Sequence, residues 1–288
     1  MYCRLSGRRG QMKTAIALGT FDGVHKGHRA VLDLPREMKK VAVIFPLPPK
    51  AILSGEPKAI MTGTDKYRVL KEIGIDEIFT LDFNEVRGMA PEDFLLFLKE
   101  KFSPSLISCG FNYRFGKNAA GNTDDISDFC ALNGIEFKCC KPVSVDGKPV
   151  SSTEIRRFLS GGDIQRANML LFEPFSFTAE VTVGDRRGRT LGFPTINQKY
   201  PKELIPIKFG VYKTKIRFDN SQYNGITNIG IRPTWQTDYI ISETYIENFS
   251  GDLYGKSVTV IPMRFIRGEV KFSSAEALVS QIKSDLNS

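Results

Sequence analysis

The chain has only two histidines, and they stand three residues apart in a glycine-rich segment, residues 19–28, which reads GTFDGVHKGH. The i, i+3 spacing of His25 and His28 would let both imidazoles point to one side of a helical turn. Glycines in such a segment allow the backbone to approach a ligand closely. Asp22 stands in the same segment, where its carboxylate could either orient an imidazole or bind Mg²⁺. These residue types at this spacing predict a site that handles phosphate.

The elements around this segment favour the same interpretation. Residues 14–18 form an apolar run that predicts a strand, and residues 29–32 begin a predicted helix. A strand, a glycine-rich turn and a helix start together present backbone N–H groups that can bind an anion. The sequence thus places the two imidazoles where a phosphate group would be bound.

The rest of the first half alternates between predicted strands and predicted helices. Strands are expected over residues 41–45, 77–82, 106–108 and 136–140, and helices over residues 64–73, 91–101 and 124–133. Such alternation is typical of a parallel sheet covered by helices on both faces. Ligands of these sheets bind at the carboxyl ends of the strands, which is where residues 19–28 would lie.

The second half has a different pattern. A helix capped by Ser152 or Thr153 is predicted over residues 151–159, and it resumes over residues 164–171 after a Gly-Gly-Asp interruption. Further on, β-branched and aromatic residues predict strands at 175–183, 210–218, 223–229, 240–249 and 257–265, followed by a helix at 274–286. Successive strands without helices between them indicate an antiparallel barrel. We therefore expect an α/β domain at residues 1–171, with residues 1–11 as a disordered extension, and a β-barrel domain with a C-terminal helix at residues 172–288.

Composition narrows the class of protein. With 41% hydrophobic and 25% charged residues, the 288-residue chain has the composition of a soluble globular protein. No apolar run approaches the roughly 18 residues that a membrane span needs, and no secretory segment is found, so a cytoplasmic location is expected. A net charge of +8 would suit nucleic acid, but Lys and Arg are spread along the whole chain, which favours small polyphosphates as partners. The cysteines form no CxxC pair, so they indicate a reducing compartment and no zinc site: Cys3, Cys109, Cys130, Cys139 and Cys140.

Residues 19–28 resemble the nucleotidylyltransferase loop of the HxGH class, in the form found in bacterial bifunctional riboflavin kinase/FMN adenylyltransferases, often called FAD synthetases. The resemblance implies that His25 and His28 bind nucleotide phosphates and stabilise the charge that develops as pyrophosphate leaves. A phosphate nucleophile is already an anion and needs no general base, so donors directed at the transition state suit this chemistry. The resemblance also implies nucleotide contacts at Gly19, Phe21, Asp22 and Gly27.

Two more segments resemble the same module. Residues 110–122, GFNYRFGKNAAGN, are similar to the family's flavin and nucleotide segment, which implies a binding role for Asn112. Residues 150–156, VSSTEIR, are similar to the family's SSTxxR element, which implies that Arg156 binds ATP phosphates beside Ser152 and Thr153. Taken alone, the first segment would be interpreted as a strand end in the core, and Arg156 as a solvated residue on a helix.

The second half resembles a riboflavin kinase. Residues 184–197, GDRRGRTLGFPTIN, are similar to the family element whose core is usually GFPTAN. Gly184, Gly188 and Gly192 can form a phosphate-cradling loop, although the chain has no Walker-type loop. The resemblance implies that Thr195 and Asn197 bind Mg²⁺ and the nucleotide, in keeping with the preference of Mg²⁺ for oxygen ligands.

A kinase that acts on a hydroxyl needs a group that accepts its proton and orients it. Residues 241–255 resemble the family strand that bears the catalytic glutamate, and this glutamate falls on Glu243. Strand alternation places Glu243, Tyr245 and Glu247 on one face, so spacing alone does not separate the two glutamates. Residues 228–234, NIGIRPT, also resemble a family segment near the kinase site, in which Arg232 is left unassigned.

The resemblance extends from about residue 14 to the end and implies a bifunctional enzyme of FAD biosynthesis that uses Mg²⁺. The barrel domain would convert riboflavin and ATP to FMN, and the α/β domain would convert FMN and a second ATP to FAD and pyrophosphate. Beside the adenylyl site the chain departs from the family, because Pro48 occupies the place of a further histidine and the first helix is expected to be short. Three alternatives remain: a riboflavin kinase with a weakened or inactive adenylyltransferase domain, a flavin-sensing or nucleic-acid-binding protein on this scaffold, and an adenylyltransferase for another acceptor.

Overall fold

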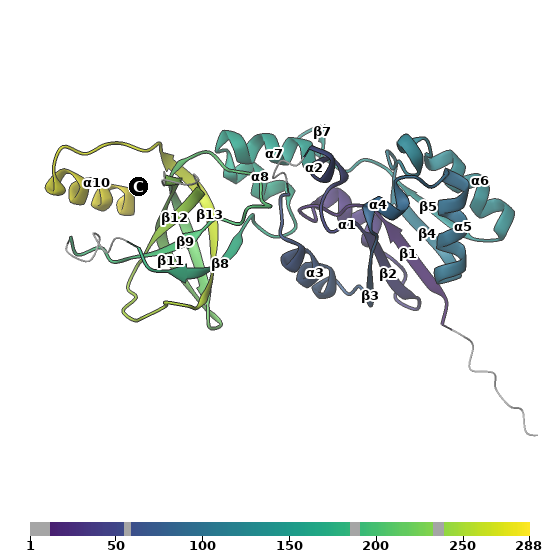
Figure 1. Cartoon of the computed structure of the whole chain (residues 1–288), viewed down its shortest axis with the longest axis horizontal. Helices are drawn as coiled ribbons and strands as arrows, with labels where there is room; N and C mark the ends of the chain where they lie inside the picture. The colour runs from purple at the N-terminus through teal and green to yellow at the C-terminus, as the bar shows by residue number, and fades with distance from the viewer. Residues whose placement is uncertain (1–11, 55–58, 185–190, 233–238) are drawn as a thin grey trace, which may run out of the picture. The chain divides into compact units, whose positions relative to one another are not determined.

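The structure, a computed structural model, describes residues 12–54, 59–184, 191–232 and 239–288. The chain forms two compact units, each assembled from segments that are not contiguous in sequence (Figure 1). The first, here called the sheet unit, comprises Met1–Phe21, Gly27–Pro46 and Tyr67–Val143. The second, here called the barrel unit, comprises Asp22–Lys26, Leu47–Lys66 and Ser144–Ser288. The histidine segment is therefore divided between the units, and residues 144–171 group with the barrel.

A five-stranded parallel sheet forms the centre of the sheet unit. Its order is β3-β2-β1-β4-β5, from the strands β1 (Thr14–Leu18), β2 (Lys39–Ile44), β3 (Glu77–Thr80), β4 (Pro104–Gly110) and β5 (Glu136–Cys140). The accompanying helices are α1 (Lys26–Leu32), α3 (Gly63–Glu72, divided between the units after Lys66), α4 (Phe83–Val86), α5 (Pro91–Phe102), α6 (Thr123–Asn133) and a 3₁₀ turn (Lys117–Ala119). Ile16 and Val41 of the sheet share one core with Leu98 of α5 and Ile126 of α6. Burial on both faces explains why the central strands are almost continuously apolar.

A closed six-stranded barrel forms the centre of the barrel unit. Its order is β10-β11-β12-β9-β8-β13, from the strands β8 (Phe177–Thr182), β9 (Thr195–Lys199), β10 (Gly210–Phe218), β11 (Ser221–Arg232), β12 (Tyr239–Ile246) and β13 (Ser257–Arg267). The unit also contains α2 (Pro49–Ser54), the hairpin β6 (Ser144–Val145) and β7 (Lys148–Pro149), α7 (Ser152–Gly161), α8 (Ile164–Leu170) and α10 (Ala275–Asn287). Ile155 and Leu159 of α7 pack in one core with Phe177 and Tyr212 of the barrel. These contacts explain why residues 144–171 group with the barrel.

Alternation along the barrel strands separates an interior face from an outer face. The interior includes Thr214, Thr227 and Thr244, which are at most 3% exposed. Hydroxyl–hydroxyl distances of 3.0 Å and 2.9 Å link the three side chains into a hydrogen-bonded ladder across β10, β11 and β12. The residues directly before and after each threonine in its strand point outward, away from the interior of the barrel.

The predicted fold class is confirmed: a parallel α/β sheet is followed by an antiparallel barrel and a C-terminal helix. The helix predicted over residues 274–286 is found at Ala275–Asn287, and the strand predicted over residues 210–218 is found at Gly210–Phe218. Strand β9 is absent from the sequence-based prediction, because it follows a Gly-Phe-Pro turn signal and its sequence TINQK is largely polar. This strand carries Thr195 and Asn197, two of the predicted ligands.

Two local predictions are wrong. Helix α1 begins at Lys26, so His25 precedes the helix and forms an isolated bridge with Leu171. The i, i+3 argument for the two imidazoles therefore fails, because only His28 lies in the helix. Helix α7 is capped by Ser151, which has extended backbone angles and accepts the Glu154 N–H at 3.2 Å, and not by Ser152 or Thr153.

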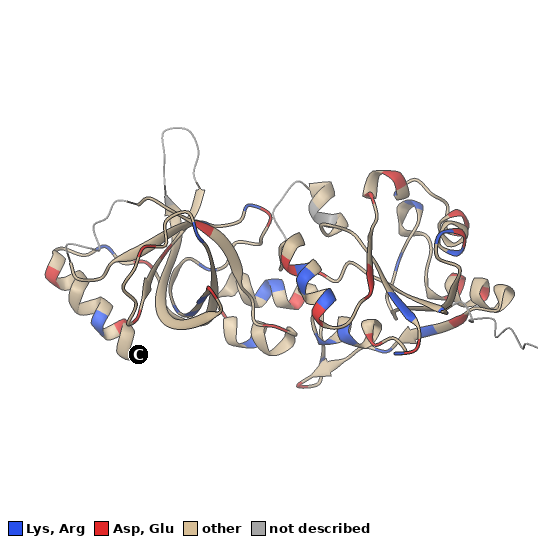
Figure 2. Cartoon of the chain, turned by 90° about the horizontal axis from the view of Figure 1, so that it is seen from below, with Lys and Arg blue, Asp and Glu red and all other residues tan. Residues whose placement is uncertain are grey.

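Charged residues are distributed over both units. Figure 2 shows Lys and Arg interspersed with Asp and Glu along the described elements. No helix in the described ranges is both long enough and apolar enough to span a bilayer. The predicted extension at residues 1–11 and the predicted loop glycine Gly188 lie outside the described residues.

Candidate active sites

In the sheet unit, Phe21 orients the imidazole of His28. The Phe21 side chain is 0% exposed, and its ring meets the His28 ring edge-on at a centroid distance of 5.3 Å. A Cβ atom at Gly19 would lie 2.9 Å from the Phe21 ring, so only glycine fits there without a shift. Gly27 lies in the first turn of α1, which has seven residues. Gly19 and Phe21 are thus placed to position His28, since the buried Phe21 ring presents no surface to a ligand.

Asn112 lies at the same edge of the sheet unit. Strands β1 and β4 are parallel neighbours, with Leu18 opposite Cys109, so the segments that follow them leave the sheet at its carboxyl edge. Asn112 follows β4 by two residues and is exposed. The predicted flavin segment and the start of the histidine segment therefore share the edge where ligands of such sheets bind.

In the barrel unit, Asp22 is the centre of a buried ionic cluster. Its side chain is 1% exposed, Oδ1 accepts the Ile60 N–H at 2.9 Å, and Oδ2 forms an ion pair with Arg156. The Ser152 hydroxyl donates to the Asp22 backbone carbonyl at 3.2 Å. Burial raises the pKa of Asp22, while the charges of Arg156 and Lys66 oppose this rise. The structure thus brings the Asp22 carboxylate to a guanidinium and a backbone N–H.

His25 belongs to the same cluster and is neutral at pH 7. It is 6% exposed, and burial, aided by the charge of Arg156, lowers its pKa to about 4. A neutral imidazole has one N–H donor and one acceptor nitrogen. His25 can therefore donate a hydrogen bond to a phosphate but adds no positive charge. Thr153, the remaining predicted residue of this region, is exposed in the first turn of α7.

A second candidate site lies on the outer face of the barrel. The register of β9, β12 and β11 places Asn197 opposite Glu243, and Glu243 opposite Asn228. Thr195 lies opposite Tyr245 on the same face. Directly opposed residues in antiparallel strands project to the same side, so all five side chains share one surface.

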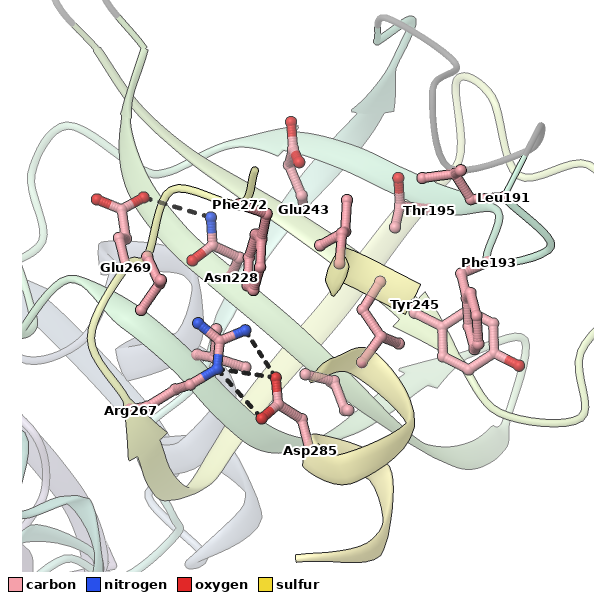
Figure 3. A pocket seen from close by; sticks show the side chains of 15 residues that line it. Leu191, Phe193, Thr195, Asn228, Glu243, Tyr245, Arg267, Glu269, Phe272 and Asp285 are labelled. Atoms are coloured by element: carbon pink, nitrogen blue, oxygen red, sulfur yellow. Dashed lines mark hydrogen bonds and ion pairs between the residues drawn. The ribbon is translucent and has the colours of Figure 1, made fainter. Parts of the chain in front are cut away.

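A cavity of about 320 Å³ opens on this surface (Figure 3). Its walls include Thr195, Glu243 and Tyr245 of the barrel, and Leu278 and Ile282 of α10. Glu247 comes directly after the last residue of β12 and does not line the cavity, so the structure separates the two glutamates that spacing could not. The cavity thus combines an apolar interior with one carboxylate near the proposed metal ligands.

Comparison with known proteins identifies the family. A sequence model of riboflavin kinase matches residues 171–288, and one of FAD synthetase matches residues 8–154. The bifunctional riboflavin kinase/FMN adenylyltransferase of Listeria monocytogenes is 30% identical over 94% of this chain and 89% of its own length. The protein of the same name from Escherichia coli K12 is 30% identical over 94% of this chain and 90% of its own. The chain belongs to the bifunctional riboflavin kinase/FMN adenylyltransferase family.

The fold is shared with a solved structure as well. A Streptococcus pneumoniae protein, described as a macrolide-efflux protein, superposes on the chain with a TM-score of 0.87 at 28% identity. The superposition covers 96% of this chain and 93% of that protein. The two-part architecture of this riboflavin kinase/FMN adenylyltransferase family member is therefore also found in an experimental structure.

The residues predicted to hold Mg²⁺ fit a hard cation. Asn197 is 6% exposed, and its Oδ1 atom has no hydrogen-bond partner among the described residues. A Cβ atom at Gly184 would lie 2.3 Å from Asn197 Nδ2, so a glycine is required for the amide to occupy this place. A buried amide oxygen without a donor suits an oxygen-seeking cation. Gly192, with φ +81°, makes the turn ahead of β9 that a side chain would strain.

Four charged residues of these sites lie outside the motifs that indicate the family. Arg267, Glu269 and Asp285 line the cavity, and Lys66 lies in the Asp22 cluster. A charged residue on the apolar face of a predicted helix is unusual, and this signal could have identified Asp285 and Lys66. Asp285 follows Leu278 and Ile282 by seven and three residues, and Lys66 precedes Val69 by three.

Proposed function

We propose that the protein phosphorylates riboflavin to FMN with ATP and then joins FMN to the AMP part of a second ATP, giving FAD and pyrophosphate. The first reaction is assigned to residues 172–288 and the second to residues 1–171, with a cytoplasmic location. Membership in the family supports both reactions. The observation that carries the kinase assignment is Glu243, which stands in an apolar cavity directly opposite the buried Asn197.

Glu243 is the proposed base of the kinase. Its carboxylate would accept the proton of the ribityl 5′-hydroxyl while the oxygen attacks the γ-phosphorus of ATP, and ADP leaves. The aromatic rings of Phe193, Tyr245 and Phe272 among the apolar lining suit a flat isoalloxazine ring. Thr195 and Asn197 would hold Mg²⁺, which neutralises phosphate charge when bound.

A second cavity fits the nucleotide. It has a volume of about 330 Å³ and is lined by Thr195 and its neighbours, by Ile246 at the end of β12, and by residues 249–254 of the loop that follows. Thr195 lines both cavities, so two substrates could meet at this side chain. This arrangement suits direct transfer of a phosphoryl group between two bound molecules.

Adenylyl transfer is assigned to the histidine segment and Arg156. An oxygen of the FMN phosphate would attack the α-phosphorus of ATP, and the bond from that phosphorus to the bridging oxygen would break to release pyrophosphate. The attacking group is an anion, so the residues need only neutralise and orient phosphates. Arg156 supplies a charge, whereas neutral His25 and the oriented His28 supply donors.

Two variants of the full-length protein test the division of labour. Glu243→Gln should abolish FMN formation from riboflavin and ATP while leaving conversion of added FMN to FAD unchanged. His28→Ala should stop FAD formation while FMN accumulates. Glu247→Gln is the matched control for the first variant, since it makes the same change outside the cavity. Separation of the flavins by chromatography measures both steps, and equal loss of both activities in either variant would contradict the assignment.

The alternative is a riboflavin kinase whose adenylyl site is weak or inactive. It is favoured by Pro48, at the place where the resemblance to the family implies a further histidine. Pro48 is buried, and its carbonyl accepts the Ile52 N–H of α2 at 3.2 Å. A proline has no group that could bind phosphate at this position. This alternative predicts FMN as the only product, even at high ATP.

A further inference from the structure

Strand β9, which carries the proposed Mg²⁺ ligands Thr195 and Asn197, has little apolar surface of its own. Its sequence is TINQK, and alternation directs Ile196 and Gln198 toward the interior of the barrel. Ile196 is only partly buried, whereas Gln198 is 0% exposed. The register of a strand is strongly specified where one of its faces is apolar and buried, and weakly specified otherwise. The apolar pattern of β9 therefore does little to fix its register.

The ladder between β9 and β8 is short as well. The two strands pair only at Val181 with Gln198 and at Thr182 with Asn197. This ladder is the shortest in the described part of the barrel, whereas β9 pairs with β12 along its whole length. A shift of β9 by one residue would turn Asn197 into the barrel and away from the face that carries Glu243.

The side chain of Gln198 crosses this short ladder. Its Nε2 atom donates to the carbonyl oxygen of Ala179 in β8 at 2.6 Å and to that of Val258 in β13 at 2.8 Å. Both partners are acceptors, so the nitrogen end of the amide must point toward them, and both of its N–H groups are used. One side chain thus links β9 to the next two strands around the barrel.

Packing of the barrel interior alone does not account for a glutamine at this place. The Oε1 atom of Gln198 is buried and has no hydrogen-bond partner among the described residues, and the same is true of the hydroxyl of Ser242, directly opposite on β12. A buried oxygen without a donor costs free energy, which an apolar side chain of similar size would avoid. The amide is therefore best explained by the two carbonyls to which it donates.

A second side chain acts on the same ladder. Thr182 Oγ1 donates to the backbone carbonyl of Asn197 at 3.2 Å. Gln198 and Thr182 therefore both hold the stretch of backbone that carries the Asn197 amide. Glu243 does not depend on this ladder, because it belongs to β12, which pairs with β11 over the whole of Tyr239–Ile246.

We propose that Gln198, assisted by Thr182, is a positioning residue for riboflavin phosphorylation, which fixes the register of β9 and so holds the two proposed Mg²⁺ ligands beside Glu243. This proposal rests on the kinase reaction assigned above. Gln198 is fully buried in the barrel interior, so it acts through the strand and touches no substrate. Its loss should weaken the binding of Mg²⁺ and ATP, which depends on β9, more than the function of Glu243.

The first test is Gln198→Met, which keeps the length of the side chain and removes both donors. In the full-length protein, the Mg²⁺ concentration that gives half the maximal rate of riboflavin phosphorylation should rise about tenfold, as expected for the loss of two buried hydrogen bonds. The KM for riboflavin should change less, and conversion of FMN to FAD should be unchanged.

The matched control is Thr214→Val, which removes a buried hydrogen bond from β10. In the order of the barrel, β10 is separated from β9 by two strands in either direction. This variant should therefore lower the stability of the barrel without changing the Mg²⁺ requirement. An equal rise in the Mg²⁺ requirement of both variants would trace the effect to general destabilisation and overturn the proposal.

Hydrogen exchange gives a second measurement that needs neither Mg²⁺ nor substrate. In Gln198→Met, exchange should accelerate in β9 (Thr195–Lys199) and stay as in the wild type in β10 (Gly210–Phe218). Support for the proposal requires both this local acceleration and the higher Mg²⁺ requirement. A side chain that only stabilises the barrel would accelerate exchange in both strands, and that result overturns the positioning role.

If Gln198→Met does not fold, Thr182→Val carries the test, because it removes only a half-buried hydroxyl. Its control is Thr178→Val, the same change on the same strand, where the hydroxyl is hydrogen-bonded to Thr259 of β13. A higher Mg²⁺ requirement in Thr182→Val alone supports the proposal, and equal requirements in the two variants overturn it.

The outcomes separate this proposal from the assigned function. If the wild-type protein forms no FMN from riboflavin and ATP, the kinase assignment fails. If the wild type forms FMN and the folded Gln198→Met keeps the wild-type Mg²⁺ requirement, the positioning role is wrong while the kinase assignment stands.

Discussion

Replacement of Asp285 by asparagine tests how α10 contributes to the kinase cavity. Asp285 is the buried residue of this helix, and its carboxylate receives three hydrogen bonds from Arg267, at 3.1, 3.0 and 2.8 Å (Figure 3). Gln281 donates to the same carboxylate at 2.8 Å. Leu278 and Ile282 of α10 line the cavity, so a ligand that fills the cavity would bury their side chains further. The ion pair with Arg267 is thus the buried side-chain contact that docks α10, beside a hydrogen bond from Lys213 Nζ to the Leu286 carbonyl.

The magnitude follows from burial. Removal of one partner of a fully buried ion pair costs about 3–5 kcal/mol. The Arg267 side chain is 21% exposed, so solvent screens part of its charge and we expect a loss of about 2 kcal/mol in α10 docking. This free energy corresponds to about a 30-fold change in the docking equilibrium. When the docked state becomes a minor state, the apparent KM for riboflavin rises in the same proportion.

The assay is riboflavin phosphorylation by the full-length protein, with hydrogen exchange of α10 measured in parallel. Asp285→Asn should raise the KM for riboflavin by up to about 30-fold and accelerate exchange in α10, while conversion of FMN to FAD is unchanged. Lys283→Gln removes a charge from an exposed position of the same helix and should change neither quantity. Faster exchange with an unaltered KM would show that α10 is not part of the flavin site, which refutes the reasoning.

Two further predictions follow from close packing and from burial. Gly184→Ala should strongly reduce riboflavin phosphorylation, because its Cβ atom would lie 2.3 Å from Asn197 Nδ2, whereas Gly161→Ala, with no atom within 4 Å, should not. A wild-type rate of riboflavin phosphorylation in Gly184→Ala would mean that the reaction does not depend on the position of the Asn197 amide. Because the pKa of His25 falls from 6.5 to about 4 on folding, the unfolded chain binds a proton first as pH drops. The contribution of neutral His25 to the free energy of unfolding is therefore fully present well above pH 6.5. About 2 kcal/mol of this free energy is lost when the pH falls to 5. Urea unfolding of the wild type and of His25→Gln at pH 7 and pH 5 measures this loss, and an equal pH dependence in both proteins would contradict it.

The fold could be predicted from sequence because its elements follow local patterns. The sheet strands are short apolar runs between helices, and the barrel strands are β-branched segments without helices between them, so periodicity was sufficient for both. Strand β9 was missed because its identity depends on pairing: Asn197 and Thr195 lie opposite Glu243 and Tyr245, which are far along the chain. A polar pentapeptide after a proline turn gives no local sign of this pairing.

The site was only partly predictable, because motifs name residues but not their partners. The predicted Asp22 and Arg156 meet in an ion pair across 134 positions, which no local spacing encodes. The same holds for Phe21, whose buried ring packs edge-on against the His28 ring. The tertiary fold decides which predicted residues touch a ligand and which hold another residue in place.

The two proposed sites differ in their charged residues, in accord with the chemistry assigned to each. The described lining of the kinase cavity contains three carboxylates, at Glu243, Glu269 and Asp285, and one cation, Arg267, which is already bound to Asp285. Such a surplus of negative charge suits proton abstraction from a neutral hydroxyl and the binding of a metal-bound nucleotide. Around Asp22 lie the positive charges of Arg156 and Lys66, and cations suit two anionic substrates and a leaving pyrophosphate. The two sets of charged residues therefore suit different reactions, which agrees with the assignment of each reaction to its own site.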